Sequence, residues 1–274
     1  MQRLRLLQEL TGFTAGLSTG LVGTGGALVM NSLQVMQGVP ARVAGASALA
    51  AILPVCVVIT LIYGFGGAQP HVDAGAAALV AIGTTVGGLL GARLAHRIRE
   101  SRLQFGLVVV LVGLGLKELL GPNLQANPGR TGSAALIVLC LLGGSAAGMV
   151  TTTFGISGGI LLVPFLALVL GMDRLLAQGT SLAAILISNA IGAAGRLDQI
   201  DRRAALHMAV GGLVGGLLGA LGSMVVSHSL LAQCFGVLAL LTAWKLAHGS
   251  RLTRRAGAAL APRRGSRCPS AVHR

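Results

Sequence analysis

The few charged residues of this chain divide it into long uncharged runs, and these runs constrain its fold more than any other feature. Charged residues make up 10% of the 274 residues, and the mean hydropathy is +0.81, whereas soluble domains carry about 25% charged residues. A membrane-spanning helix needs about 20 consecutive apolar residues. The chain is therefore predicted to be an all-α polytopic membrane protein. The uncharged runs are 10–41, 43–72, 74–92, 131–172, 175–195 and 204–244.

One glycine-rich stretch occurs twice, as Gly16–Ala27 and as Gly148–Gly159. At an offset of 133 residues, Gly25-Gly26 of the first copy aligns with Gly158-Gly159 of the second. Glycine costs about 1 kcal/mol relative to alanine inside a helix, so these clusters predict a helix break in each copy. Interrupted apolar segments at corresponding places in two halves are typical of transporter binding sites.

The duplication predicts two four-segment repeats, each with a Gly-broken first segment. The first repeat covers residues 1–121, a linker covers 122–132, and the second repeat covers 133–247. Residues 248–274 form a basic tail that we expect to be disordered and cytoplasmic. The predicted helices are 10–22, 27–38, 43–64, 74–93 and 103–121 in the first repeat, and 133–154, 160–170, 174–194, 204–227 and 229–247 in the second.

The first segment of each repeat is predicted to be a re-entrant hairpin. Helices over 10–22 and 27–38 would each be about 18–20 Å long, which is too short for a hydrocarbon core of about 30 Å. With both broken segments re-entrant and the N-terminus inside, 18 of the 21 basic residues lie in the cytoplasm; eight full crossings place 15 there. The positive-inside rule favours the hairpins. Against them, a helix over 133–154 would be about 33 Å long and could span alone.

Glycine stripes predict where other helices pack closely. Gly83, Gly87, Gly88 and Gly91 give the helix over 74–93 a stripe of small residues, and Gly87–Ala92 recurs as Gly215–Ala220. Small residues let membrane helices approach each other closely. At the end of the helix over 43–64, Tyr63 and Phe65 are expected to act as aromatic anchors at the membrane interface.

The net charge of +14 does not indicate a nucleic-acid partner, because aromatic residues are only 3% of the chain and no basic face is interleaved with them. The arginines instead occupy short loops and the tail, where they set orientation. The four cysteines show no paired spacing, so no metal and no cofactor is expected. The first apolar stretch has no clear cleavage site and is expected to be retained. The expected location is the bacterial inner membrane.

The two breaks offer groups that suit an anion. Helices that start at a break expose unpaired N–H groups and a partial positive charge. Hydroxyl and amide side chains cluster around both breaks and on the helices that follow, including Thr151 and Gln178. The alternative is that these hydroxyls only satisfy backbone carbonyls freed at the breaks. The predicted substrate-binding residues are Ser18, Thr19, Gly23, Thr24, Gly25, Gly26, Ser47, Thr152, Thr153, Gly155, Ser157, Gly158, Gly159, Thr180, Ser181 and Asn189.

Ionisable residues inside the predicted helices are few. His207 could carry a proton, although its place near a loop also fits an interfacial histidine. Lys117 and Glu118 are expected to pair at the level of the lipid headgroups. Gly155–Gly159 matches the Gly-x-Ser-x-Gly pattern and resembles the serine motif of rhomboid intramembrane proteases. A nucleophilic serine needs a base within hydrogen-bond reach, and His207 is the one candidate inside the predicted helices.

The chain resembles the TauE/SafE family of membrane proteins, described as sulfite exporters or anion permeases. The resemblance covers residues 8–247 and rests on the duplicated break, on the step from Gly158-Gly159 to Val163-Pro164, and on the run Gly179–Leu182. The first copy departs from it, with Met30-Asn31 in place of Val163-Pro164 and Ala46–Ala48 in place of Gly179–Ser181.

The resemblance implies a transporter, not an enzyme, for sulfite, a sulfonate or another organosulfur anion. An intramembrane serine protease that uses Ser157 and a passive anion channel are the alternatives. No Gly-x-x-x-x-Gly-Lys motif occurs in the chain, so transport is expected to be secondary. The expected partners are the small anion and the lipid bilayer; coupled protons and a homo-oligomer are left open.

Overall fold

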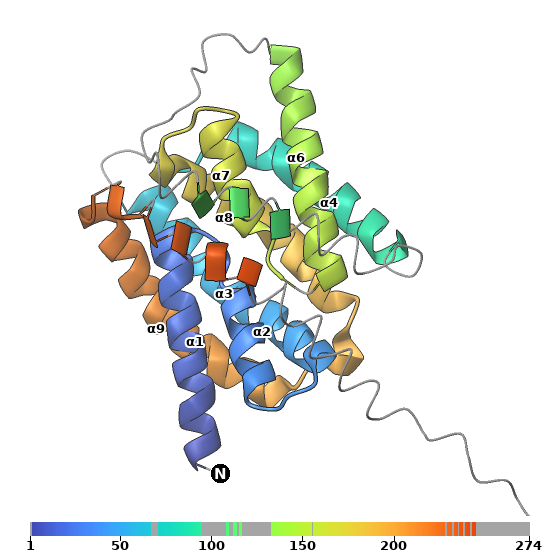
Figure 1. Ribbon diagram of the computed structural model, residues 1–274, viewed down its shortest axis with the longest axis vertical. Coiled ribbons are helices and arrows are strands. Elements are labelled where there is room, and N and C mark those ends of the chain that lie inside the picture. The colour runs from blue at the N-terminus through green and yellow to red at the C-terminus, as the bar shows by residue number, and fades with distance from the viewer. Residues whose placement is uncertain are drawn as a thin grey trace, which may run out of the picture.

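Every element that the computed structural model describes is a helix (Figure 1). The described residues are 2–66, 71–94, 108–109, 112–113, 115–116, 133–154, 156–227, 229–231, 233–234, 236–237, 239–241 and 243–244. The elements are α1 (Gln2–Val22), α2 (Ala27–Met36), α3 (Ala41–Phe65), α4 (Ala74–Leu94), α6 (Ser133–Phe154), α7 (Gly159–Leu168), α8 (Arg174–Ala194), the 3-10 turn η2 (Leu197–Gln199) and α9 (Arg202–Val225).

Within the described residues, five helices are long and apolar enough to cross a membrane: α3, α4, α6, α8 and α9. The helices α2 and α7 are apolar but have only 10 residues each. At 1.5 Å per residue they reach about 15 Å, or half of the hydrocarbon core. The prediction of an all-helical membrane protein is confirmed.

The first helix is longer than predicted. α1 begins at Gln2 and not at residue 10, so its 21 residues extend about 32 Å. The basic residues Arg3 and Arg5 therefore lie on its first turns and not in a separate leader. The prediction placed the start at residue 10 because the uncharged run begins there. The charged residues before it also have good helix propensity, so the helix extends through them to Gln2.

Several predictions fall wholly or partly outside the described residues. These are the helix over 103–121, the linker, the basic stretch 93–102, the Lys117–Glu118 pair and the tail 248–274. The helix predicted over 229–247 is described only in short pieces, all of them helical. The division into domains stays a prediction.

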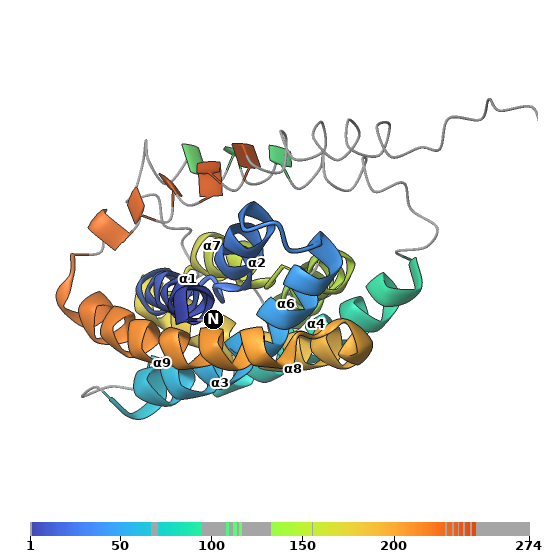
Figure 2. The same cartoon turned by 90° about the horizontal axis from the view of Figure 1, so that it is seen from below.

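The closest packing joins the first helix of each half to a helix of the other half. A methyl group added at Gly16 of α1 would lie 2.1 Å from the carbonyl oxygen of Gly212 in α9. One added at Gly87 of α4 would lie 1.9 Å from the carbonyl oxygen of Ser145 in α6. In both views α1 lies next to α9 and α6 lies next to α4 (Figures 1 and 2). The predicted glycine stripes are therefore contact faces.

The helix directions follow from these contacts. Gly12 and Gly20 of α1 meet Met208 and Gly216 of α9 in the same order, so α1 and α9 are parallel. Val55 and Ile59 of α3 likewise meet Gly212 and Gly216 of α9, so α3 is parallel to both. Because α1 and α3 run in the same direction, α2 must return the chain between them.

The return is visible in a side-chain contact. The amide nitrogen of Gln37, directly after α2, donates to the hydroxyl of Thr11 at 3.0 Å. The end of α2 therefore lies beside the middle of α1. α2 thus returns as far as the middle of α1, while α1 itself, at about 32 Å, is long enough to span the hydrocarbon core, so re-entrance stays a prediction.

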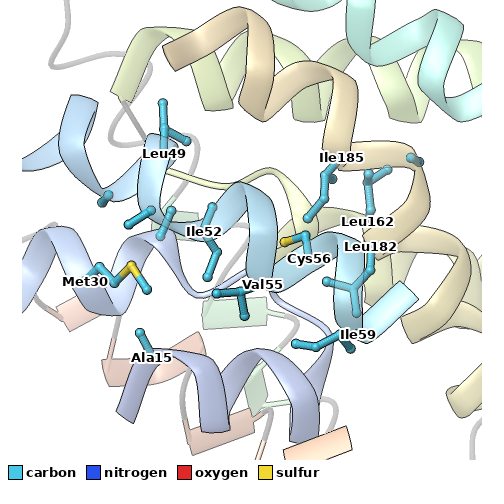
Figure 3. Packing of buried hydrophobic residues seen from close by; sticks show 14 of the residues in the cluster. Ala15, Met30, Leu49, Ile52, Val55, Cys56, Ile59, Leu162, Leu182 and Ile185 are labelled. Carbon is cyan, nitrogen blue, oxygen red and sulfur yellow. The ribbon is translucent and has the colours of Figure 1, made fainter. Parts of the chain in front are cut away.

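The apolar core lies where α3 crosses between α1 and α8. Figure 3 shows Ile52, Val55 and Cys56 of α3 between Ala15 of α1 and Ile185 of α8, all buried. α3 and α8 are antiparallel, because Leu49 of α3 meets Gly192 of α8 while Tyr63 meets Gly179. The two central helices therefore cross the molecule in opposite directions, next to the breaks that precede them.

Cysteine labelling at the junction of α2 and α3 tests the hairpin. Ala41 is exposed and is the first residue of α3. In vesicles of a cysteine-free background, Ala41→Cys should react with an impermeant maleimide from the cytoplasmic face only, since the hairpin returns the chain to that face. Met172→Cys, which is external in both topologies, is the orientation control. Labelling of Ala41→Cys from the outside would show a full crossing.

Substituting an interface glycine should destabilise the fold. Gly16→Ala and Gly87→Ala each force a methyl group against backbone, and overpacking of this kind costs about 1–3 kcal/mol. Gly64→Ala in α3 is the matched control, because a methyl group there has no heavy atom within 4 Å. Thermal unfolding of the purified protein in detergent should rank both interface variants below the control; equal melting temperatures would contradict this packing.

Candidate functional site

Both predicted helix breaks are present. α1 ends at Val22 and α2 begins at Ala27; α6 ends at Phe154 and α7 begins at Gly159. In the first break, Gly23, Gly25 and Gly26 have φ values of 74°, 78° and 51°. This left-handed region is strained for residues with a Cβ atom, which explains why glycine occupies these positions.

The structure places the two breaks in direct contact. A methyl group added at Gly25 would lie 2.1 Å from the hydroxyl oxygen of Ser157. One added at Gly159 would lie 2.8 Å from the carbonyl oxygen of Thr24 and 2.9 Å from that of Gly23. These five residues come from the predicted site, and we call the place where they meet the junction. Gly155, also predicted, lies outside the described residues.

The short helices that leave the junction begin without side-chain caps. α2 is preceded by Gly26 and α7 by Gly158, and neither glycine can cap a helix with its side chain. The N–H groups of a first helical turn have no partner within the helix. Of these groups, the N–H of Ala27 donates to the carbonyl of Gly25 and that of Leu161 donates to the carbonyl of Gly158. The remaining N–H groups of each first turn and the positive end of the helix dipole favour an anion.

Several of the predicted hydroxyls hydrogen-bond to their own helices. Thr19 donates to the carbonyl of Ala15 at 2.7 Å, and Thr151 donates to that of Ala147 at 2.9 Å. Ser18 also donates to Ala15, and Thr152 donates to Gly148. These hydroxyls therefore have partners one turn earlier in their own helices, at carbonyls that do not belong to the breaks.

Ser47 and Thr180 hold turns in the opposite half. The hydroxyl of Ser47 accepts from the backbone N–H of Asp201 at 2.9 Å, and that of Thr180 accepts from Asp73 at 3.0 Å. Asp201 and Asp73 in turn accept from backbone N–H groups at the starts of α9 and α4. Ser47 and Thr180 thus hold the turns that lead into α9 and α4.

Three predicted site residues have buried polar atoms without a protein partner. The Ser157 hydroxyl, with 1% of the residue exposed, has none, and neither do the Ser181 hydroxyl and both side-chain polar atoms of Asn189. An unpaired polar group costs free energy when it is buried. These atoms therefore remain available for a ligand.

The fully buried polar side chains of this region are uncharged, and the half-buried guanidinium of Arg196 lies at the end of α6. Among the described residues, every buried side chain with a polar oxygen or nitrogen is Ser, Thr, Gln, Asn or Tyr. Thr24 is 5% exposed and belongs to this set, whereas Thr153 is half-buried. An anion here would be held by hydroxyl, amide and backbone N–H groups, without a buried ion pair.

Sequence reasoning missed the role of Tyr63, which is buried and is not an interface anchor. Its phenol oxygen lies 2.6 Å from the carbonyl oxygen of Gly20, 2.8 Å from the Ser223 hydroxyl and 3.1 Å from the side-chain oxygen of Gln178. Gln178 also donates to the carbonyl of Leu21 at 3.2 Å. This cluster satisfies the carbonyls that the end of α1 leaves free.

Arg196 has the corresponding role in the second half. Its guanidinium donates to the carbonyl oxygens of Thr152 and Thr153 at the end of α6. Burial first, and then the nearby charge of Arg42, lower the pKa of Arg196. The sequence did carry a signal, because Tyr63, the single tyrosine, and Arg196 are donors separated by the repeat offset of 133.

His207 is far from the candidate serine. Its ring nitrogen Nδ1 lies 3.1 Å from a carboxylate oxygen of Glu9. Glu9 precedes the end of α1 by 13 residues, or about 20 Å of helix, while Ser157 lies beside Gly25 just beyond that end. His207 is therefore not placed to activate Ser157.

The fold and the junction define a class: a multi-pass helical membrane protein in which two interrupted helices meet, as in membrane transporters. The comparisons with known proteins agree. The model of the family described as "Sulfite exporter TauE/SafE" matches residues 2–118 and 119–272. The chain belongs to this family.

Curated relatives have the same general description. A "Probable membrane transporter protein" of Xylella fastidiosa strain Temecula1 is 32% identical over 248 residues, which is 85% of this chain and 91% of the relative. The protein of the same description from strain 9a5c is 32% identical over 184 residues, covering 63% of this chain and 68% of the relative. No solved structure matches significantly.

Removing the phenol hydroxyl should weaken the end of α1. Tyr63→Phe keeps the buried ring but leaves the carbonyl of Gly20 and the polar atoms of Gln178 and Ser223 less well paired, at a cost of about 1–3 kcal/mol. Thermal unfolding in detergent should show a lower melting temperature. Ser227→Ala, which removes an exposed hydroxyl, is the control and should change nothing measurable; an unchanged melting temperature for Tyr63→Phe would contradict the role.

Proposed function

We propose that this protein is a secondary transporter that binds a small anion, a sulfur oxyanion or an organic sulfonate, at the junction. Ser157 carries the proposal most directly. Its hydroxyl is buried, has no protein partner, and lies between the break of the first half and the start of α7. An unpartnered donor next to an uncapped helix start is the arrangement that an anion would complete.

The family supports the choice of substrate. The matched family is described by sulfite export, and the curated relatives are described as membrane transporters. A sulfite or sulfonate group spreads one or two negative charges over three oxygens. Several neutral donors can therefore hydrogen-bond to the same group. Donors from both halves would surround such a group at the junction.

The duplicated architecture supports coupling to a gradient. Two breaks that meet allow one half to move against the other around a fixed site, which is alternating access. We place the protein in the bacterial inner membrane with a cytoplasmic C-terminus, following the distribution of basic residues. Proton coupling and a homo-oligomer are further parts of the proposal that the flux experiment and the oligomeric state in detergent would test.

Flux into proteoliposomes tests the function. Purified protein should carry sulfite or a small sulfonate in a saturable manner under a pH gradient. Flux without saturation would indicate a passive channel. Cleavage of a membrane-embedded peptide, lost in Ser157→Ala, would indicate the protease. A folded protein that moves no anion would contradict the proposal.

Two substitutions at the junction should reduce this flux. Ser157→Ala removes one hydrogen-bond donor to a charged group. It should raise the half-saturation concentration for the anion about tenfold or more, since such hydrogen bonds contribute about 1.5–3 kcal/mol. Gly25→Ala puts a methyl group on the Ser157 hydroxyl in a left-handed conformation and should nearly abolish flux. Ser145→Ala, whose hydroxyl donates to its own helix, is the control; equal flux in all three variants would exclude the junction as the site.

A further inference from the structure

One helix, α8, runs past both breaks. Gln178 packs against Gly23 of the first break, Ile185 packs against Gly25 beside Ser157, and Gly192 lies near Thr151 at the end of α6. Positions 178, 185 and 192 repeat every seven residues and lie on one helix face. This face of α8 therefore lies against the junction and continues to the end of α6.

The same face carries two of the unpartnered residues. Ser181 lies one turn before Ile185, and Asn189 lies one turn after it. Both are fully buried, and neither the Ser181 hydroxyl nor the Asn189 amide has a protein partner. Since each lies between positions that contact a break, both are placed along the junction.

The matching face of α3 is apolar. At the offset of 133, the counterparts of Ser181, Ile185 and Asn189 are Ala48, Ile52 and Cys56, all fully buried. Ile52 approaches the first break, since a methyl group added at Gly26 would lie 3.1 Å from its Cδ1 atom. The two halves therefore present different chemistry at corresponding positions.

Asn189 adds a constraint on the ligand. Its side chain has one acceptor oxygen and an amide nitrogen with two donors, and both atoms are unpartnered. A fully ionised oxyanion can satisfy the nitrogen but has no hydrogen for the oxygen. A ligand that also bears a hydroxyl or amine hydrogen can satisfy both.

We infer that α8 selects the substrate through Ser181 and Asn189 while α3 supplies an apolar wall, so that the substrate is a small organic anion bearing its own hydrogen-bond donor. This inference rests on the proposed function and deepens it. The charged group lies toward the uncapped helix starts and Ser157, the donor group faces Asn189, and the aliphatic part lies against Ile52. Ser181 and Asn189 are thus specificity-determining residues.

A pair of sulfonates of equal size tests the inference. 2-Hydroxyethanesulfonate and propane-1-sulfonate differ by a hydroxyl in place of a methyl group. A site that hydrogen-bonds a substrate hydroxyl rejects the analogue without it strongly. In proteoliposomes, the hydroxylated compound should compete for flux at least about tenfold better than its analogue, and better than sulfate.

Variants on the two helices assign the selectivity. Asn189→Leu, close in size but apolar, should reduce the preference for the hydroxylated sulfonate to less than about twofold, and Ser181→Ala should weaken both sulfonates. The variants Ala48→Ser and Cys56→Ser, at the corresponding positions of α3, should keep the wild-type preference for the hydroxylated sulfonate. Gel filtration and melting temperature identify variants that do not fold, and Ser181→Ala, which only removes a hydroxyl, keeps the test valid if Asn189→Leu fails.

The outcomes separate the two proposals. Absence of flux for every anion with folded protein would overturn the transport function. Flux in which Asn189→Leu keeps the full preference, or in which the α3 variants change it as strongly, would overturn the inference and leave the transport function standing. Equal competition by both sulfonates in the wild-type protein would also overturn the inference.

Discussion

The structure depends on how the protein satisfies backbone groups that two helix breaks leave free in an apolar interior. A membrane offers no water to such groups, so each interrupted helix needs partners from elsewhere in the chain. The end of α1 is paired by Tyr63 and Gln178, and the end of α6 by Arg196. The starts of α2 and α7 have no side-chain cap. This asymmetry leaves backbone donors at the two helix starts for a guest.

The close glycine contacts bring the broken helices together. α1 packs on α9 and α6 on α4 through glycines, so the first helix of each half is held by the other half. Ser47 and Thr180 repeat this exchange by anchoring the turns at Asp201 and Asp73. Neither half could form the junction alone, which explains why small residues recur at the repeat spacing along so much of the chain.

Much of this could be predicted from sequence. The uncharged runs indicated membrane helices, and the glycine clusters at 23–26 and 155–159 located both breaks. The start of α1 was missed because charged first turns do not interrupt a helix, and Tyr63 was misread because an aromatic residue at a helix end looks the same whether it faces lipid or a neighbouring carbonyl. Which hydroxyls bond to their own helix and which stay unpartnered, as for Thr19 and Ser157, depends on tertiary contacts that the pattern does not contain.

Locating a heavy anion in the folded protein tests the central claim most directly. Selenite resembles sulfite in shape and charge, and selenium scatters anomalously. In crystals soaked with selenite, we expect the anomalous peak within hydrogen-bond distance of the Ser157 hydroxyl, beside Gly25 and the first turn of α7. A well-ordered protein whose selenium peaks lie only at surface arginines, with none at the junction, would contradict the account.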